Sequence, residues 1–313
     1  MIGQSNCNFK LLPKVELHAH LNGSISLKTI RELLEKQSDR PEEYVLQQPV
    51  NMEDFFLLFP LIQELTQKPE ALRKATHDVI EEFAEDNVIY LELRTTPKNT
   101  PFTNKKQYVE IVLEAIEKSN ERLKMLTTLI LSIDRKQSVE EAAETVDLAI
   151  SIDSELIVGV ELSGDPKIDG RKMIPELQRA RDAGLGVAVH LAEMSQYLEE
   201  VPEFLDFRPD RIEICLTSNE MCKTTKSADE SHLMYWIESG VPVALCTDDK
   251  SVMGCDSSGE YEKAYKALSK RVEEPFQLLR KITTDALKHS FIRKKSNTGK
   301  YEKLLASLDF LPL

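Results

Sequence analysis

The chain has 313 residues, of which 41% are hydrophobic and 30% are charged, a composition typical of a globular protein and not of a disordered, collagen-like or coiled-coil one. Forty Lys and Arg stand against 53 Asp and Glu, and the resulting net charge of −13 disfavours binding to nucleic acid polymers or to membrane surfaces. The length allows one large domain of the size that α/β barrels reach.

Apolar, β-branched runs alternate with amphipathic stretches along the chain, which predicts βαβ units around a parallel sheet. Seven strands are expected, at 15–20, 88–95, 126–134, 156–164, 185–193, 211–219 and 241–249. Helices are expected at 27–36, 52–65, 70–86, 105–123, after a capping box at Ser138 and Glu141, and at 171–183, 230–239, 260–271 and 275–289. No linker or repeat interrupts this alternation, so we expect one domain over residues 1–313, with a polar, tail-like segment at 290–300.

Several motifs are absent from the sequence. No GxGxxG follows the first expected strand and no GxxxxGK[ST] occurs, which favours a (β/α) barrel over a dinucleotide-binding sheet. The longest apolar run, 55–62, is far shorter than the ~20 residues of a membrane span, and the first ten residues lack the apolar core of a signal peptide. Five dispersed cysteines are typical of reduced thiols. We therefore expect a cytoplasmic protein, and we expect it to be a monomer.

Polar residues end several expected strands, where barrel enzymes build their active sites. They are His18 and His20 on the first strand, His190 and Glu193 on the fifth, and Asp248 and Asp249 on the last. Side chains two apart on a strand share one face, so His18 and His20 point the same way. Three imidazoles with one carboxylate suit Zn²⁺, and a site with an open position for water would be catalytic. Taken alone, a histidine such as His190 on an apolar strand is more often a hydrogen-bonded core residue, and the two aspartates could equally cap a helix.

These motifs resemble the adenosine deaminase family, and within it the adenosine-deaminase-like branch that acts on N6-methyl-AMP. The resemblance rests on runs in the family's order, LPKVELHAHLNGS at 12–24, LELRTTPK at 91–98, LSGDP at 162–166, HLAE at 190–193, LTSN at 216–219 and TDD at 247–249. It implies a zinc-dependent barrel that hydrolyses N6-methyl-AMP to IMP and methylamine, with a small-molecule purine nucleotide as its partner.

The resemblance also implies roles for individual residues. One zinc ion would be held by His18, His20, His190 and Asp248, and Glu193 would donate a proton to the purine ring. Substrate contacts are implied for His20, for Asn22 at the sugar, for Asp249 and Gly164 at the base, and for Asp134. Asn22 stands where nucleoside-specific relatives have Asp, and Thr95, Thr96 and Lys98 could bind a 5′-phosphate. Because a proton donor must be neutral, we expect an upward pKa shift for Glu193.

Two features depart from the family pattern. The family's Gly-His-Gly at the end of the sixth strand, whose histidine acts on the zinc-bound water, is absent, and Gln63 stands where the branch usually has a histidine. Only the 17 residues 194–210 separate the fifth expected strand from the next, too few for a β/α unit of roughly 30 residues. We therefore expect a barrel one unit short, with an open seam and an exposed apolar edge beside the fifth strand.

Three interpretations of function stay open at this point. The first is an active purine aminohydrolase, acting on the monophosphate or, as an adenosine deaminase, on the nucleoside. The second is a nucleotide- and metal-binding relative without turnover, and the third is an amidohydrolase acting on another amide or amine.

Overall fold

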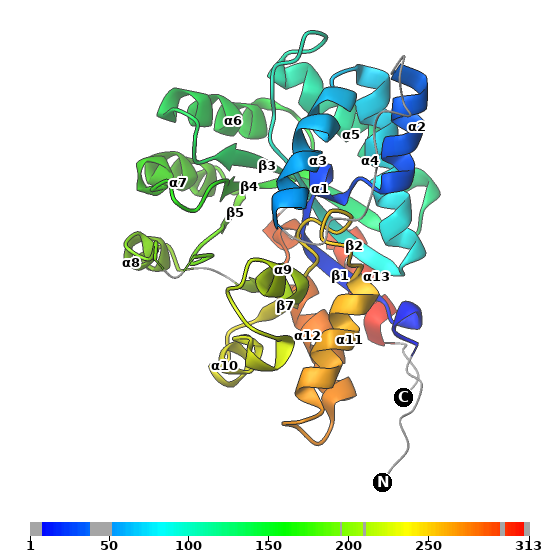
Figure 1. Ribbon diagram of the computed structural model, residues 1–313, viewed down its shortest axis with the longest axis vertical. Helices are drawn as coiled ribbons and strands as arrows, with labels where there is room; N and C mark the ends of the chain where they lie inside the picture. Colours follow the sequence, from blue (N-terminus) through cyan, green and yellow to red (C-terminus); the bar gives the residue numbers. More distant parts are fainter. Residues whose placement is uncertain (1–7, 38–51, 195, 209–210, 295–297, 310–313) are drawn as a thin grey trace.

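The strands form a curled parallel sheet, as the computed structural model shows for residues 8–37, 52–194, 196–208, 211–294 and 298–309 (Figure 1). Five strands pair in sequence order, β1 (Lys14–His20), β2 (Val88–Thr95), β3 (Leu126–Asp134), β4 (Ile157–Ser163) and β5 (Gly186–Val189). Two more, β6 (Ile212–Ile214) and β7 (Val243–Leu245), form a separate parallel pair. The expected seven strands are therefore all found in the described part of the chain.

Helices connect the strands and lie outside the sheet (Figure 1). The short helix η1 (Phe9–Leu11) precedes β1 in the described part of the chain, and α1 (Leu21–Ser24), α2 (Leu27–Gln37), α3 (Met52–Leu65) and α4 (Pro69–Glu85) lie between β1 and β2. The next strands are followed by α5 (Lys105–Arg122), α6 (Val139–Ser151), η3 (Arg171–Met173) with α7 (Ile174–Asp182), and α8 (Val201–Asp206). After β6 come α9 (Leu216–Met221), η4 (Ala228–Glu230) and α10 (Leu233–Glu238), and after β7 come α11 (Ser257–Leu268), α12 (Pro275–Lys288), η5 (Phe291–Lys294) and α13 (Thr298–Asp309). The capping box predicted at Ser138 and Glu141 begins α6.

The sheet is open between β5 and β6. At the other side of the β6–β7 pair the chain closes onto β1, because Asp248 N donates to His18 O at 2.8 Å and His20 N donates to Asp248 O at 3.0 Å. Within the described strands, β5 pairs only with β4 and β6 only with β7. This arrangement confirms the predicted barrel that lacks one unit, with its seam beside the fifth strand.

Apolar side chains are exposed in the segment that follows β5. Tyr197, Leu198 and Leu205 are 40%, 46% and 48% exposed, and β5 itself is half-buried from Val187 to Val189. A strand covered on both faces and both edges would bury these positions. The seam therefore leaves an incompletely covered apolar edge, as expected.

The expected strand 211–219 is shorter than predicted, because its second half is helical. Residues Leu216–Met221 form α9, and the buried Glu260 carboxylate accepts hydrogen bonds from Leu216 N at 2.7 Å and Thr217 N at 3.3 Å. A carboxylate at a helix N-terminus satisfies free backbone N–H groups, and this long-range contact overrides the local strand pattern. The fifth strand likewise ends at Val189, before His190.

The beginning of the stretch 290–300, at residues 290–294, packs against the sheet. Phe291 is buried, and its ring lies against the start of β5, where a Cβ on Gly186 would come within 2.1 Å of a ring carbon. Only glycine allows this close approach. The η5 segment therefore fills the amino-terminal end of β4 and β5, the end opposite the polar strand termini.

Two smaller expectations concern the thiols and the membrane. The four cysteines in the described part of the chain, Cys215, Cys222, Cys246 and Cys255, are free thiols, and Cys7 lies outside it. None of the helices in the described ranges is both long enough and apolar enough to cross a lipid bilayer.

Candidate active site

Three histidines converge at the carboxyl ends of the strands. His18 and His20 end β1, and their Nε2 atoms lie 3.2 Å apart. His190 directly follows β5, where its backbone N–H donates to Leu162 O at 2.9 Å, and its ring centroid lies 4.6 Å from that of His18 and 5.1 Å from that of His20. One ligand atom of each ring lies within 4.8 Å of the others, so the three rings are close enough to share one ion.

Asp248 completes this cluster from the end of β7. Its Oδ1 lies 3.3 Å from His18 Nε2 and 3.4 Å from His20 Nε2, and its Oδ2 accepts a hydrogen bond from Ser218 Oγ at 2.8 Å. The backbone of Asp248 has a φ of 61°, a left-handed conformation that Asp tolerates better than most residues. The sharp turn after β7 thus aims this carboxylate at the histidines.

The spacing of these atoms fits a zinc ion. Zinc bonds of ~2.0–2.1 Å in a tetrahedral site separate the ligand atoms by about 3.3 Å, which is the spacing found between His18, His20 and Asp248. His190 Nε2 is buried and makes no hydrogen bond, and Glu161 Oε2 lies 3.5 Å from it, so a metal ion there would take the place of a proton on this nitrogen. His18 Nδ1 pairs with Glu213 Oε2 at 2.9 Å, which leaves the Nε2 lone pair of His18 for the ion.

Burial and nearby charges shift the pKa values of His18 and His20 in opposite directions. Burial lowers the pKa of His20 to about 4, so this ring is neutral and able to coordinate a metal at neutral pH. Burial also opposes protonation of His18, but the carboxylates of Asp248 and Glu213 raise its pKa above the ordinary value. Burial raises the pKa of Asp248, but the contact with His18 and the other imidazoles nearby lower it more, so the pKa lies below its ordinary value. Asp248 is therefore an anion, as a zinc ligand must be.

His190 and Glu193 form a close pair, with 2.7 Å between Nδ1 and Oε1. Burial would lower the pKa of His190, but the Glu193 and Glu161 carboxylates raise it well above its ordinary value. Burial raises the pKa of Glu193, but the His190 charge outweighs burial, and the pKa lies below its ordinary value. The expected upward shift for Glu193 is therefore wrong, because it considered burial and not the adjacent imidazole.

Asp249 packs against Gly23 in α1. A Cβ on Gly23 would lie 1.6 Å from Asp249 Oδ1, so the carboxyl group occupies the space that a side chain would need. Burial and the Asp248 charge raise the pKa of Asp249 well above its ordinary value. This shift favours the neutral carboxyl group, which in that form could donate a hydrogen bond to a ring nitrogen.

Gly164, expected at the base, and Asp134, expected at another substrate contact, lie together at the ends of β4 and β3. Gly164 has a φ of 104°, and Asp134 Oδ1 lies 2.5 Å from the place of a Cβ on it. Gly164 is exposed and Asp134 half-buried. The positive φ and the contact with Asp134 both require glycine at this position. Because glycine has no side chain, the exposed backbone of Gly164 is accessible to a ligand.

The turn after β2 and the start of α1 hold unsatisfied polar atoms. Lys98 Nζ is buried without a hydrogen-bond partner, 5.8 Å from the Tyr108 ring centroid, and burial lowers its pKa to about 8. Asn22 Oδ1 is also buried without a partner. Thr95 Oγ1 is instead engaged with Tyr108 Oη at 2.7 Å, whereas Thr96 is half-buried. The described part of the chain supplies the Lys98 ammonium with no counter-ion, so an anion could bind there.

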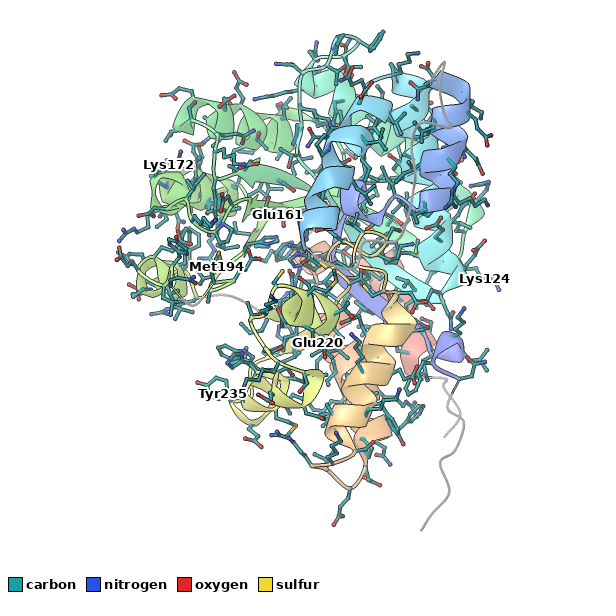
Figure 2. All side chains as sticks on the ribbon, viewed as in Figure 1. Lys124, Glu161, Lys172, Met194, Glu220 and Tyr235 are labelled. Carbon is teal, nitrogen blue, oxygen red and sulfur yellow. The ribbon has the colours of Figure 1, made fainter. Side chains whose placement is uncertain are left out.

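Sequence reasoning missed a group of buried charges under the histidines. They are Glu92 and Arg94 on β2, Glu161 on β4, and Arg211 and Glu213 at β6, and Figure 2 shows Glu161 in the interior beside the barrel centre. Their signal in the sequence was a charged residue inside an otherwise apolar strand. Burying such charges is costly unless they are paired with opposite charges, so their presence in the strands indicates a network of ion pairs in the barrel interior.

Comparisons with known proteins agree with this geometry. The family model for adenosine deaminase matches residues 13–211 and, in a second overlapping segment, 194–306. An adenosine deaminase-like protein of Caenorhabditis elegans is 41% identical over 330 positions that cover 95% of this chain and 84% of the relative. That alignment is longer than the whole 313-residue chain, so it includes positions that this chain lacks.

Two further relatives extend the comparison. N6-Methyl-AMP deaminase-L of Xenopus laevis is 38% identical over 304 positions, covering 86% of this chain and 88% of the relative. A crystal structure of Arabidopsis ADAL complexed with IMP superposes with a TM-score of 0.83 at 31% identity, covering 96% of this chain and 97% of that one. The chain therefore belongs to the adenosine deaminase family, in the branch of adenosine deaminase-like proteins and N6-methyl-AMP deaminases.

Proposed function

We propose that the chain is a zinc-dependent hydrolase that removes the 6-amino substituent of a purine nucleoside monophosphate, with N6-methyl-AMP as its preferred substrate. The observation that carries this proposal is the cluster at the strand ends, in which His18 Nε2, His20 Nε2 and Asp248 Oδ1 have the spacing of zinc ligands and a ligand atom of His190 lies within 4.8 Å of those of the other two histidines. Membership of the deaminase family directs this metal chemistry to the purine ring.

The residues around the cluster would divide the work. Zinc held by these four side chains would lower the pKa of water to near 7 and so supply a nucleophile at neutral pH. Glu193 lies beside His190, where its carboxylate could take a proton from the attacking water and pass it to the ring nitrogen next to the carbon under attack. Asp249, held protonated by burial, would donate to a second ring nitrogen, and the Gly164 N–H would orient the base.

The preference for a monophosphate rests on Lys98 and Asn22. Lys98 is a buried cation without a partner, and Asn22 brings no negative charge near the sugar. A charge-assisted hydrogen bond from Lys98 to a phosphate oxygen would satisfy this ammonium. Solved relatives from Arabidopsis complexed with IMP and with GMP show that the branch accommodates purine monophosphates.

The missing unit favours a second candidate, a nucleotide- and metal-binding relative without efficient turnover. Loss of a positioned general base typically costs about 10²–10⁴-fold in rate. Asp248 and the carboxylates near it would have to take over the proton that the absent histidine accepts in relatives. We therefore propose turnover well below that of relatives with the complete barrel.

The test is a side-by-side assay of amine release. The purified chain is loaded with one equivalent of Zn²⁺ and incubated separately with N6-methyl-AMP, AMP and adenosine, with Glu193→Gln as the matched control. We expect slow methylamine release from N6-methyl-AMP that Glu193→Gln abolishes, and less release from adenosine. A preference for adenosine would refute the monophosphate assignment, and IMP binding without any amine release would establish the second candidate.

A further inference from the structure

We propose that Arg94 is a positioning residue of the metal site, whose guanidinium holds two carboxylates, the half-buried Glu213 and the buried Glu161, against the three histidines. This inference rests on the zinc site proposed above and goes beyond it, because none of these three residues belongs to the ligand set. Arg94 lies near the end of β2 and is 1% exposed.

The first carboxylate, Glu213 on β6, controls His18. Its Oε2 accepts hydrogen bonds from both Arg94 Nη2 and His18 Nδ1, the latter at 2.9 Å. A carboxylate on Nδ1 fixes the tautomer and the rotation of the ring, and so turns Nε2 towards the metal. The position of Glu213 in turn depends on the guanidinium, which also donates to Leu17 O on β1.

The second carboxylate, Glu161 on β4, faces the other two histidines. Arg94 Nη1 donates to Glu161 Oε2 at 2.5 Å. Glu161 Oε2 lies 3.5 Å from His190 Nε2, and Oε1 lies 3.6 Å from His20 Nδ1. Ser132 Oγ also donates to this carboxylate. One guanidinium thus fixes the two groups that flank all three imidazoles.

The ion pairs of Arg94 matter more in this chain than they would in a closed barrel, because the sheet is open beside β6. The β6 strand, which carries Glu213, pairs with β7 but, among the described strands, not with β5. Arg94 connects it to β2 and β4, and Arg211 adds bonds from its Nε to Glu213 Oε1 at 3.0 Å and from its Nη2 to Glu92 Oε2 at 2.5 Å. Side-chain ion pairs therefore connect β6 to β2 and β4 across the interior, on the side where β6 does not pair with β5.

Positioning can be separated from charge by the choice of variant. Arg94→Met would remove a buried positive charge. The removal by itself would favour binding of a metal cation nearby, and this effect would mask the loss of histidine orientation. Arg94→Lys keeps the charge, but an ammonium lacks the planar fork that bridges two carboxylates. A change in metal binding by Arg94→Lys therefore reports orientation.

The experiment measures zinc affinity by chelator competition and the visible spectrum of the Co²⁺-loaded chain. We expect Arg94→Lys to weaken Zn²⁺ binding about 10- to 100-fold and to shift the Co²⁺ bands, as loss of outer-shell partners does elsewhere. The matched control is Lys14→Met, which removes another buried cation, on β1, that contacts Asp86 at 3.9 Å instead of the carboxylates at the histidines. It should lower stability and leave zinc affinity and the Co²⁺ spectrum unchanged.

If Arg94→Lys does not fold, a second variant, Glu213→Gln, tests the same inference. Glu213→Gln conserves volume and should also weaken zinc at least 10-fold, and in its background Arg94→Lys should lose part of its effect, because the two residues act through one contact. Wild-type zinc affinity and an unchanged Co²⁺ spectrum in a folded Arg94→Lys, or in Glu213→Gln, would overturn the inference. Failure of the unmodified chain to bind zinc would instead overturn the metal site itself.

Discussion

The Arg135 guanidinium donates a hydrogen bond to the backbone carbonyl oxygen of His190, with 2.7 Å between nitrogen and oxygen. Arg135 follows β3, and His190 follows β5, the strand whose outer edge has no partner at the seam. Arg135 also forms a buried ion pair of 2.6 Å with Glu200, just before α8. A histidine at the open side of the barrel is thus held by a buried side chain from two strands away.

We predict that Glu200→Gln destabilises the fold by about 3–5 kcal/mol, because it leaves the buried Arg135 charge without its partner. Urea unfolding followed by circular dichroism measures this loss. The matched control is Glu203→Gln on α8, which breaks only the exposed pair with Arg171 and should leave the unfolding midpoint unchanged. Equal midpoints for both variants would show that the buried pair does not support the seam.

Zinc should stabilise the folded chain. A ligand that binds only the native state adds about 2.7 kcal/mol at a free concentration of 100 times its Kd. We therefore expect Zn²⁺ to raise the thermal unfolding temperature of the unmodified chain and a chelator to reverse the rise. His190→Ala should abolish the response, and an equal rise in that variant would place the ion elsewhere.

Lys98 should distinguish monophosphates from nucleosides. Lys98→Ala removes a charge-assisted hydrogen bond to phosphate, which is typically worth ~1.5–3 kcal/mol, or about 10- to 100-fold in affinity. Calorimetry with IMP and inosine measures the difference, and Lys124→Ala, at an exposed lysine before β3, serves as the control. An equal loss for both ligands would mean that Lys98 does not contact the phosphate.

The same lysine predicts a pH dependence. Burial lowers the pKa of Lys98 to about 8, so the ammonium is charged below this pH and loses its proton as the pH rises through it. Affinity for IMP should therefore fall between pH 7 and pH 9, whereas affinity for inosine and for IMP in Lys98→Ala should change little. Parallel curves for IMP and inosine would contradict this assignment.

The metal cluster and the seam could be predicted from the sequence for separate physical reasons. His18 and His20 share a face because strand side chains alternate, and the seam follows from a segment too short to hold a β/α unit. The helical start at Leu216 could not be predicted, because the Glu260 carboxylate that caps it lies 44 positions away. The lowered pKa of Glu193 could not be predicted either, because it depends on the orientation of the His190 ring. Contacts between distant segments decide both features.

The central claim is that His18, His20, His190 and Asp248 bind one zinc ion together. Anomalous diffraction at the zinc edge, from crystals of the zinc-loaded chain, tests this claim most directly. We predict a single strong peak within about 2.0–2.2 Å of one ligand atom from each of the four side chains. A zinc-loaded crystal with no peak there, or with a peak bound by other residues, would contradict the account.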